Sequence, residues 1–284
     1  MIRQKSFHNK RATLFLVPTP IGNMTEISMR QKETLEKVDV IACEDTRNSG
    51  QLLKTLGINK RLIAYQNFNE ENSSKGILSL LEEGKDVALI SDAGYPLISD
   101  PGQKVVQLVS RSGYNVVPIS GSSAILNALV ASGLVVQPFL FVGFLGNQAS
   151  QRRKRLKEFK DYPMTMVFYE APHRIEKCLK DCLEILGDRS CTLAREMTKL
   201  HEEFIRGTFS EILEICKELK GEMVLVVEGA AESDEVDFNE VVGEVQKLVD
   251  QGFRTKEASK QIADKMGLSK NKVYDLYLET LPKE

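Results

Sequence analysis

Short apolar runs alternate with longer amphipathic stretches through the first half of the chain. Five of the runs contain the branched and aromatic residues typical of buried strands, and they cover residues 13–17, 39–43, 61–65, 87–91 and 115–119. The stretches between them carry apolar residues at helical spacing. Strands without an alternating polar face predict a mostly parallel sheet with helices on both sides. Ligands bind such sheets beyond the carboxyl ends of the strands, so the loops after these runs are expected to line a cleft.

The sequence VALISDAGYPLISDPG at residues 87–102 makes this expectation specific. An apolar run gives way at once to aspartates, glycines and prolines. A buried approach followed by turn-forming polar residues is typical of a strand that delivers a loop to a ligand. The loop after residue 91 is therefore expected to line the cleft.

The second half has a different rhythm. Its strand candidates lie at residues 138–146, 164–170, 190–196, 201–209 and 221–229. Their connections differ in length and one is short enough for a turn, which predicts a mixed sheet. After an acidic linker at 230–237, the tail shows three helical patterns. Ala258, Ile262 and Ala263 fall at packing positions and Gly267 at a turn, an arrangement that resembles a helix-turn-helix.

The expected fold class is α/β, in three parts. Residues 1–135 form a parallel-sheet domain, residues 136–231 a mixed-sheet domain, and residues 232–284 a linker with a small helical domain. A length of 284 residues is compatible with two or three such units.

Composition adds several exclusions. A formal net charge of −2 gives no global attraction to nucleic acid, so any such contact must come from local patches. No apolar run approaches the roughly 18 residues that suggest a membrane span, and the basic start lacks the apolar core of a secretory signal. A cytoplasmic location without membrane contact is expected.

Cys178 and Cys182 lie one helical turn apart in an amphipathic pattern. They are therefore expected on a buried helix face rather than at a metal, and no metal site is expected.

The first loop excludes the common dinucleotide fingerprint. Residues 17–23 read VPTPIGN, with prolines where that fingerprint has glycines. Prolines make this loop stiff and poor in donors, which suits the edge of a flat ligand, although a rigid structural turn is the favoured interpretation of this segment taken alone.

Seven motifs in fixed order are far more specific. They read VPTPIGNMTEIS, ACEDTRNSGQLL, SDAGYPLISDPG, PISGSSAILNALVASGL, FYEAPHRI, AREMTKLHEEFIRGT and GEMVLVVEG. Together they closely resemble the RsmI family of small-subunit (16S) ribosomal RNA (cytidine-2′-O)-methyltransferases, a branch of the tetrapyrrole methylase superfamily. The resemblance covers residues 13–229 nearly continuously and extends loosely into the tail.

This resemblance implies an enzyme of two tetrapyrrole-methylase domains with S-adenosyl-L-methionine between them. Many superfamily members carry Gly-Asp-Pro where this chain has Gly94-Tyr95-Pro96, so the acidic partner of the cofactor is expected to be Asp92 instead. The cofactor contacts that the resemblance implies are Pro20, Ile21, Asp92, Gly94, Tyr95, Pro96, Ile98, Ser123, Ala124 and Glu170. The expected partners are small-subunit ribosomal RNA, free or in the assembled 30S subunit, and a second copy of the chain in a homodimer.

Methyl transfer to a ribose hydroxyl requires a group that removes the hydroxyl proton or lowers its pKa. Glu44 and Asp45 follow the second strand at the cleft edge and are candidate proton acceptors. Asp45 is equally suited to cap the helix that follows. His201 is a further candidate because it titrates near neutrality, and strand alternation is expected to place it on the same face as Glu203, with Glu202 on the other. A solvated or core-paired histidine is the competing interpretation.

Candidate RNA contacts are basic. The densest cluster follows a glycine-containing loop and comprises Arg152, Arg153, Lys154 and Arg155. Arginine binds phosphate through geometry as well as charge, although such a run is also typical of a solvated helix face. Arg47, Arg174 and Lys199 are additional candidates. Arg174 is expected in the first turn of a helix beginning at Pro172, where it could instead pair with Glu170.

Two other functions stay open from the sequence alone. A tetrapyrrole methylase would use the same cofactor on a macrocycle, but it predicts neither a basic patch nor a helical appendage. A non-enzymatic regulator that binds nucleic acid through the tail would leave the cleft loops without a purpose and predicts no cofactor.

Overall fold

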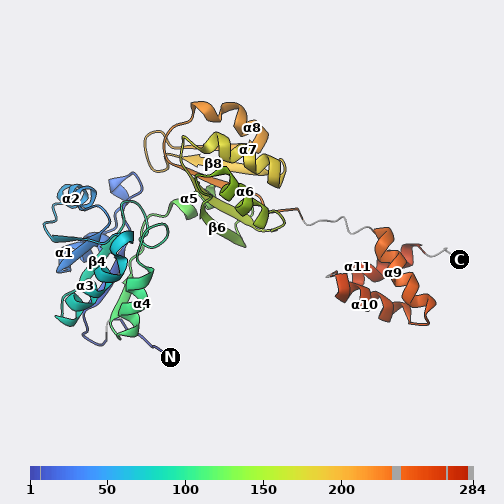
Figure 1. Cartoon of the computed structure of the whole chain (residues 1–284), viewed down its shortest axis with the longest axis horizontal. Helices are drawn as coiled ribbons and strands as arrows, with labels where there is room; N and C mark the ends of the chain where they lie inside the picture. The colour runs from blue at the N-terminus through green and yellow to red at the C-terminus, as the bar shows by residue number, and fades with distance from the viewer. Residues whose placement is uncertain (7, 232–237, 267, 281–284) are drawn as a thin grey trace. The chain divides into compact units, whose positions relative to one another are not determined.

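The computed structural model describes residues 1–6, 8–231, 238–266 and 268–280. The chain forms two compact units, Met1–Gly229 and Ala230–Glu284. The first unit contains two five-stranded sheets (Figure 1). Among the described residues no helix is long and apolar enough to cross a lipid bilayer.

The first sheet is entirely parallel, in the order β3-β2-β4-β1-β5, which confirms the predicted parallel α/β architecture. Its strands are β1 (Thr13–Val17), β2 (Val40–Cys43), β3 (Arg61–Ala64), β4 (Val87–Ile90) and β5 (Asn115–Pro118). Helices α1 (Met29–Lys37) and α2 (Thr46–Thr55) cover one face, and α3 (Glu70–Glu82) and α4 (Gln103–Arg111) cover the other. Both faces of the sheet are therefore buried, as its continuous apolar strands require.

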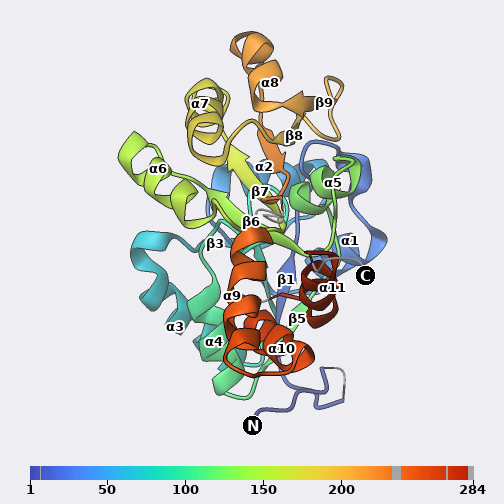
Figure 2. The ribbon, with the colours of Figure 1, turned by 90° about the vertical axis from the view of Figure 1, so that its right-hand side faces the viewer.

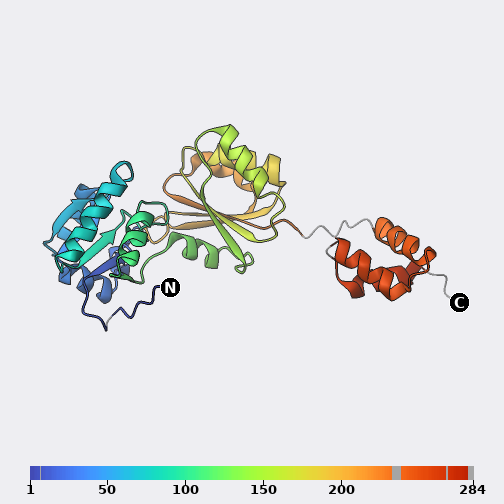
Figure 3. The ribbon, with the colours of Figure 1, turned by 60° about the horizontal axis from the view of Figure 1, so that its bottom comes forward.

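The second sheet is mixed, as predicted, in the order β6-β7-β10-β8-β9. Only β6 and β7 run parallel, and the other neighbours are antiparallel. Its strands are β6 (Phe139–Phe144), β7 (Thr165–Glu170), β8 (Ser190–Arg195), β9 (Glu203–Thr208) and β10 (Met223–Val227). Helices α6 (Ala149–Glu158), α7 (Ile175–Leu186) and α8 (Phe209–Ile215) pack on one face. Helix α5 (Ala124–Ala131) lies on the other face (Figure 3).

The position of α5 shifts the division between the two sheets. Ile125, Ala128 and Leu129 pack with residues of β7, β8 and β10, so α5 contributes to the core of the second sheet. The sequence places residues up to 135 with the first sheet. In the structure the chain has already passed to the second sheet at the start of α5.

Two predicted element starts are wrong. β9 begins at Glu203, and His201 and Glu202 lie in the turn before it, so the predicted alternation of these side chains along a strand does not occur. Helix α7 begins at Ile175, and residues 172–174 form a turn, so Arg174 precedes the helix.

Cys178 and Cys182 are both fully buried on α7, in the core that this helix shares with the sheet, as its amphipathic pattern predicts. The described part of this unit also contains three short 3-10 helices: η1 (Met24–Glu26), η2 (Asn67–Asn69) and η3 (Cys216–Glu218).

The second unit is a bundle of α9 (Phe238–Asp250), α10 (Thr255–Met266) and α11 (Lys270–Thr280), which pack against one another (Figure 2). Ala258, Ile262 and Ala263 are buried in its core together with Val245 and Tyr277, which confirms the predicted packing face. The expected turn at Gly267 and most of the linker, residues 232–237, lie outside the described residues.

Candidate active site

A cavity of about 380 Å³ lies in the first unit, between the loops after β1, β4 and β5 and the edge of the second sheet. Except for Pro20 and Pro96, every expected cofactor contact lines it: Ile21, Asp92, Gly94, Tyr95, Ile98, Ser123, Ala124 and Glu170. Pro96 is buried and Pro20 lines a neighbouring cavity. Segments that are far apart in the sequence therefore meet around one space, as the carboxyl ends of parallel strands dictate.

Hydrogen bonds tie the three loops of the first sheet together. The backbone amide of Thr19 donates to the Gly94 carbonyl at 2.9 Å, and the Gly94 amide donates back at 3.0 Å. The Gly121 amide donates to the Tyr95 hydroxyl at 3.1 Å. Gly94 has φ +73°, a conformation that side chains disfavour, and a Cβ here would stand 3.4 Å from Ile21 Cγ2. Glycine thus keeps this wall of the cavity close-fitting.

A cluster of carboxylates lies at the first-sheet side of the cavity. Asp100 lines it, and burial together with the charges of Glu44 and Asp92 raises the pKa of Asp100 to about 6. Glu44 also shares a hydrogen bond with Asp100. Asp92 accepts a hydrogen bond from Asn48 Nδ2 at 3.0 Å. Asp100 belongs to the loop after β4 and was missed by the sequence interpretation, although it lies in the same motif as Asp92.

The two other candidate proton acceptors have different surroundings. Asp45 caps α2, because its carboxylate accepts from the Arg47 amide at 2.8 Å. The Arg47 side chain and amide also lower the pKa of Asp45. His201 is exposed in the turn before β9 and lines neither this cavity nor its neighbour. The capping role is therefore observed for Asp45, and Glu44 is the sequence candidate that contacts the carboxylate cluster.

Glu170 and an aromatic group form the second-sheet side. The buried Glu170 carboxylate accepts from Arg174 Nε at 2.9 Å and from the Ala171 amide at 2.8 Å, so Arg174 is engaged in the ion pair that the sequence left as an alternative. Tyr169 lines the cavity, and its ring lies 5.0 Å from that of Phe141 and 5.5 Å from that of Phe144. Burial, with a contribution from Asp100, raises the pKa of Tyr169 to about 12, so its hydroxyl stays neutral.

A tight turn after β8 adds Met197 to the lining. Its neighbours Glu196 and Thr198 have φ +48° and +69°, unusual for residues with side chains. Lys199 Nζ donates to Glu196 at 3.0 Å and to Glu222 at 2.9 Å. Burial disfavours its charge, but the hydrogen bonds to these two carboxylates outweigh burial and raise the Lys199 pKa. Lys199, an expected RNA contact, thus holds the turn beside the cavity.

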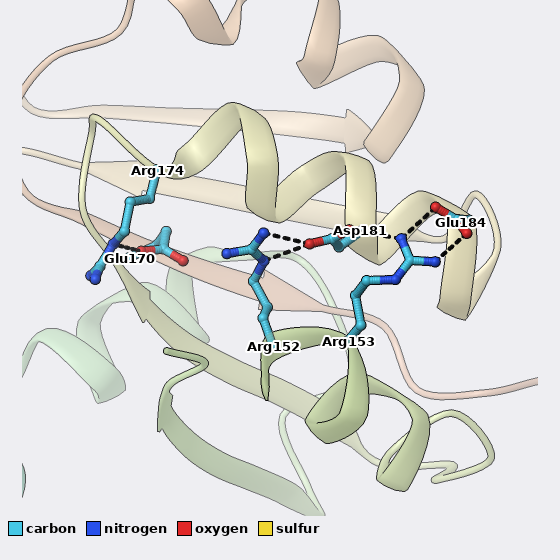
Figure 4. A network of polar contacts seen from close by, with 6 residues as sticks. All are labelled: Arg152, Arg153, Glu170, Arg174, Asp181 and Glu184. Carbon is cyan, nitrogen blue, oxygen red and sulfur yellow. Dashed lines mark hydrogen bonds and ion pairs between the residues drawn. The ribbon is translucent and has the colours of Figure 1, made fainter. Parts of the chain in front are cut away.

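Arg152 and Arg153 of the basic cluster point toward carboxylates of α7 (Figure 4). Arg152 is buried, and its Nε donates to Asp181 Oδ2 at 2.7 Å. Arg153 donates to Asp181 and Glu184. Arg155 donates to the carbonyls of Val142 and Phe144, both at 3.1 Å. Lys154 is exposed and forms no ion pair within the described part of the chain. The expectation that Arg152 faces RNA phosphate is wrong, because its guanidinium neutralises a buried carboxylate.

A second cavity of about 270 Å³ adjoins the first and shares Asp92 with it. It is lined by the loop after β1 and by α2, including Pro20, Asn48 and Gln51. Among the described residues, no group of three or more His, Cys, Asp or Glu is arranged to hold a metal ion.

The first cavity fits S-adenosylmethionine in size and chemistry. Its volume falls in the range of small-molecule sites, about 300–1,000 Å³. Much of its lining is apolar, including Ile98, Met197 and Val224, and suits an adenosine. The carboxylates at Asp92 and Asp100 suit a ligand that carries positive charge.

Known proteins share both the sequence and the fold. The family model of the tetrapyrrole (corrin/porphyrin) methylases matches residues 13–213. The chain is 44% identical to ribosomal RNA small subunit methyltransferase I of Bacillus subtilis, over 97% of this chain and 98% of the relative. It is 42% identical to the protein of the same name from Halalkalibacterium halodurans, over 98% and 99%.

Solved structures resemble it at lower identity. Diphthine synthase aligns with a TM-score of 0.60 at 16% identity, covering 77% of this chain and 90% of that one. A cobalt precorrin-4 methyltransferase aligns with a TM-score of 0.58 at 15% identity, covering 76% and 94%. These two likenesses concern the fold alone. The family match and the near-full-length relatives establish that the chain belongs to the tetrapyrrole methylases and, within them, to the ribosomal RNA small subunit methyltransferase I family.

Proposed function

We propose that this chain transfers a methyl group from S-adenosylmethionine to the 2′-hydroxyl of a cytidine ribose in small-subunit ribosomal RNA, in its decoding region. The near-full-length similarity to relatives that are named for this RNA is the observation that carries the proposal. The cavity supports it, because eight of the ten residues that the family resemblance assigns to the cofactor line one space. Such a substrate implies a cytoplasmic location.

The residues of the first cavity divide the task of holding the cofactor. The tied loops around Gly94 and Tyr95 and the start of α5 at Ser123 form one wall, and Glu170 with Val224 forms the other. Carboxylates at Asp92 and Asp100 favour a cationic ligand over its neutral product, which promotes product exchange. When bound, S-adenosylmethionine supplies a methyl group on a sulfonium. Its thioether is a good leaving group for in-line displacement.

The chain's main chemical contributions are positioning and proton removal. Asp100, which lies beside Glu44, holds its proton at an unusually high pH for an aspartate, since burial and the nearby carboxylates raise its pKa to about 6. A carboxylate with such a pKa accepts a proton near physiological pH and passes it to solvent. We assign this role to the pair rather than to Asp45 or His201, because Asp45 is engaged as a helix cap and His201 does not line the cavity.

Fewer residues are available to contact RNA than the four basic residues at 152–155, because the three arginines among them bond to groups of the fold. Lys154 is exposed, and the Arg47 side chain is 90% exposed at the start of α2, where it pairs with Asp45. The exposed Lys260 and Lys270 of the second unit add basic groups on its α10 and α11 helices. We infer that these groups bind phosphates of the ribosomal RNA, in the free molecule or in the assembled subunit.

We further infer a homodimer. No Asp, Glu, Lys or Arg occurs between Arg111 and Arg152, although charged residues make up 27% of the chain. Apolar side chains are exposed along this stretch, at Leu126, Val130, Val135, Val136 and Phe139. An uncharged apolar surface suits a second copy better than RNA. Analytical ultracentrifugation of the wild type and Val130→Glu tests this inference, and a monomeric wild type contradicts it.

Two experiments test the proposed activity. Mass mapping of ribosomal RNA nucleosides from cells with and without the gene should show loss of one 2′-O-methylcytidine, and an unchanged pattern contradicts the proposal. Calorimetry of the purified protein should detect binding of S-adenosylmethionine or its demethylated product. A porphyrin or corrin precursor methylated in place of RNA would support the first alternative, and the absence of cofactor binding would support the non-enzymatic one.

A further inference from the structure

Two loops separate the first cavity from the second. In the loop after β1, Pro20 and Gly22 line the second cavity, whereas Ile21 between them lines the first. In the loop after β4, Ser91 lines the second cavity and Asp92 lines both. A molecule with one end in each cavity would therefore pass beside Asp92.

The second cavity is polar but nearly uncharged. Among the described residues that line it, Asp92 is the one charged residue. Several of its hydroxyls are already engaged: Thr19 donates to the Ser91 carbonyl at 3.1 Å, and Thr55 donates to the Gln51 carbonyl at 3.0 Å. Asp92 repels a phosphate, and no lining Lys or Arg compensates. The cavity therefore suits a neutral group that forms hydrogen bonds.

Two carboxamides on α2, those of Asn48 and Gln51, line this cavity. Asn48 and Gln51 are three residues apart, so they share a helix face. Asn48 Nδ2 donates to Asp92 Oδ2 at 3.0 Å, and this bond fixes the carboxamide with Oδ1 left as a hydrogen-bond acceptor. The Gln51 carboxamide forms no hydrogen bond within the described part of the chain and supplies both a donor and an acceptor.

We propose that the second cavity holds the base of the target nucleotide, with its exocyclic amino group donating to Asn48 Oδ1 and Gln51 Nε2 donating to a ring acceptor. Cytosine matches this pattern, since it presents an amino group beside two acceptors. Uracil presents a carbonyl oxygen where Asn48 also presents an oxygen. Enzymes that act on a nucleotide commonly hold it unstacked in such a pocket.

This assignment rests on the proposed function and extends it to substrate specificity. With the base in the second cavity, the ribose lies beside Asp92, the residue that lines both cavities. The hydroxyl to be methylated then faces the first cavity, where the cofactor residues lie. Asn48 is thus a specificity residue that touches the substrate base.

The test compares methylation of two small-subunit preparations from cells lacking the gene, with cytidine or uridine at the modified position. We expect the wild type to prefer cytidine in kcat/KM. Asn48→Ala should lower kcat/KM on cytidine on the order of tenfold and bring the cytidine-to-uridine ratio close to one. Gln51→Leu should lower activity on both substrates. Binding of S-adenosylhomocysteine should be unchanged in both variants.

Gln107→Leu is the matched control, because Gln107 is exposed on α4 and lines neither cavity. If Asn48→Ala retains the wild-type ratio, or loses activity equally on both substrates, the assignment of the base is overturned. A wild type that methylates neither preparation is a separate result: it overturns the proposed function on which the assignment rests.

Discussion

Arg152 on α6 and Asp181 on α7 form an ion pair that is closed off from solvent. Two guanidinium nitrogens of Arg152, Nε and Nη2, lie 2.7 and 2.5 Å from Asp181 Oδ2, and the two side chains are 4% and 11% exposed. The pair joins neighbouring helices on one face of the second sheet (Figure 4). The most basic segment of the sequence thus contributes to the stability of the fold.

Arg152→Ala should lower the free energy of unfolding by up to about 3–5 kcal/mol, because Asp181 loses its buried partner and retains Arg153, which it shares with Glu184. Urea denaturation monitored by circular dichroism measures the change. Lys154→Ala is the matched control and should change the free energy by less than about 0.5 kcal/mol. Equal effects of the two substitutions would show that the ion pair has no structural importance.

Lys154 should contribute to RNA binding instead. Lys154→Ala is expected to weaken binding of a small-subunit RNA fragment and to reduce the slope of log K against log salt by about one, as the loss of one phosphate contact requires. Fluorescence anisotropy at several salt concentrations measures this slope. Lys75→Ala serves as the control, because Lys75 pairs with Glu71 on α3 and lies outside both cavities. An unchanged slope for Lys154→Ala would exclude the contact.

Activity should depend on the protonation of Asp100. Burial and the charges of Glu44 and Asp92 raise its pKa to about 6. The stability contributed by this raised pKa is full below the ordinary aspartate range and is lost as the pH rises through about 6. The carboxylate needed for proton removal forms over the same interval, so kcat/KM should rise as the pH increases through about 6.

Methyl-transfer rates across this interval, at saturating cofactor, test the dependence. Asp100→Asn should abolish it. Asp86 provides a control, since burial also raises its pKa but it lies before β4, at the opposite end of the strand. Asp86→Asn should leave the pH profile of activity intact. A wild-type profile that is flat around pH 6 argues against Asp100.

Gly22 should not tolerate a side chain. It has φ +144°, and a Cβ at this position would lie 2.5 Å from Lys199 Cγ. Gly22→Ala is expected to displace Lys199 and the turn that carries Met197, and so to lower cofactor affinity measured by calorimetry. Gly76→Ala in α3 is the matched control, because a Cβ there meets nothing within 4 Å and alanine favours the helix. Similar cofactor affinities in both variants would refute this account.

Removal of residues 230–284 should separate the two binding activities. The second unit has its own buried core, so the first unit should remain folded without it. We expect weaker activity on small subunits and unchanged affinity for S-adenosylhomocysteine. If both fall together, the helical unit stabilises the first unit and its role is structural.

The sequence predicts the sheets well because continuous apolar runs are the direct signature of buried strands, as in β4 and β10. It does not predict that Asp100 approaches Glu44, since tertiary folding of two separate loops makes that contact. Met197 reaches the cavity because its neighbours Glu196 and Thr198 adopt positive φ angles. Residues with side chains rarely adopt such angles, so the sequence does not predict this turn. The sequence does contain an indication that Arg152 is buried. Arg152 lies one helical turn before the apolar Leu156, so both residues fall on the same face of α6, and both are buried.

The alternation of Pro20, Ile21 and Gly22 has an energetic consequence. One short piece of backbone forms a boundary of both cavities, so a displacement on one side changes the shape of the other. If a ligand in one cavity displaces this backbone, it changes the affinity of the other cavity for its own ligand. The ligand in the second cavity then changes the affinity of the first by the same factor. Cofactor binding and nucleotide binding would then be thermodynamically linked through three residues.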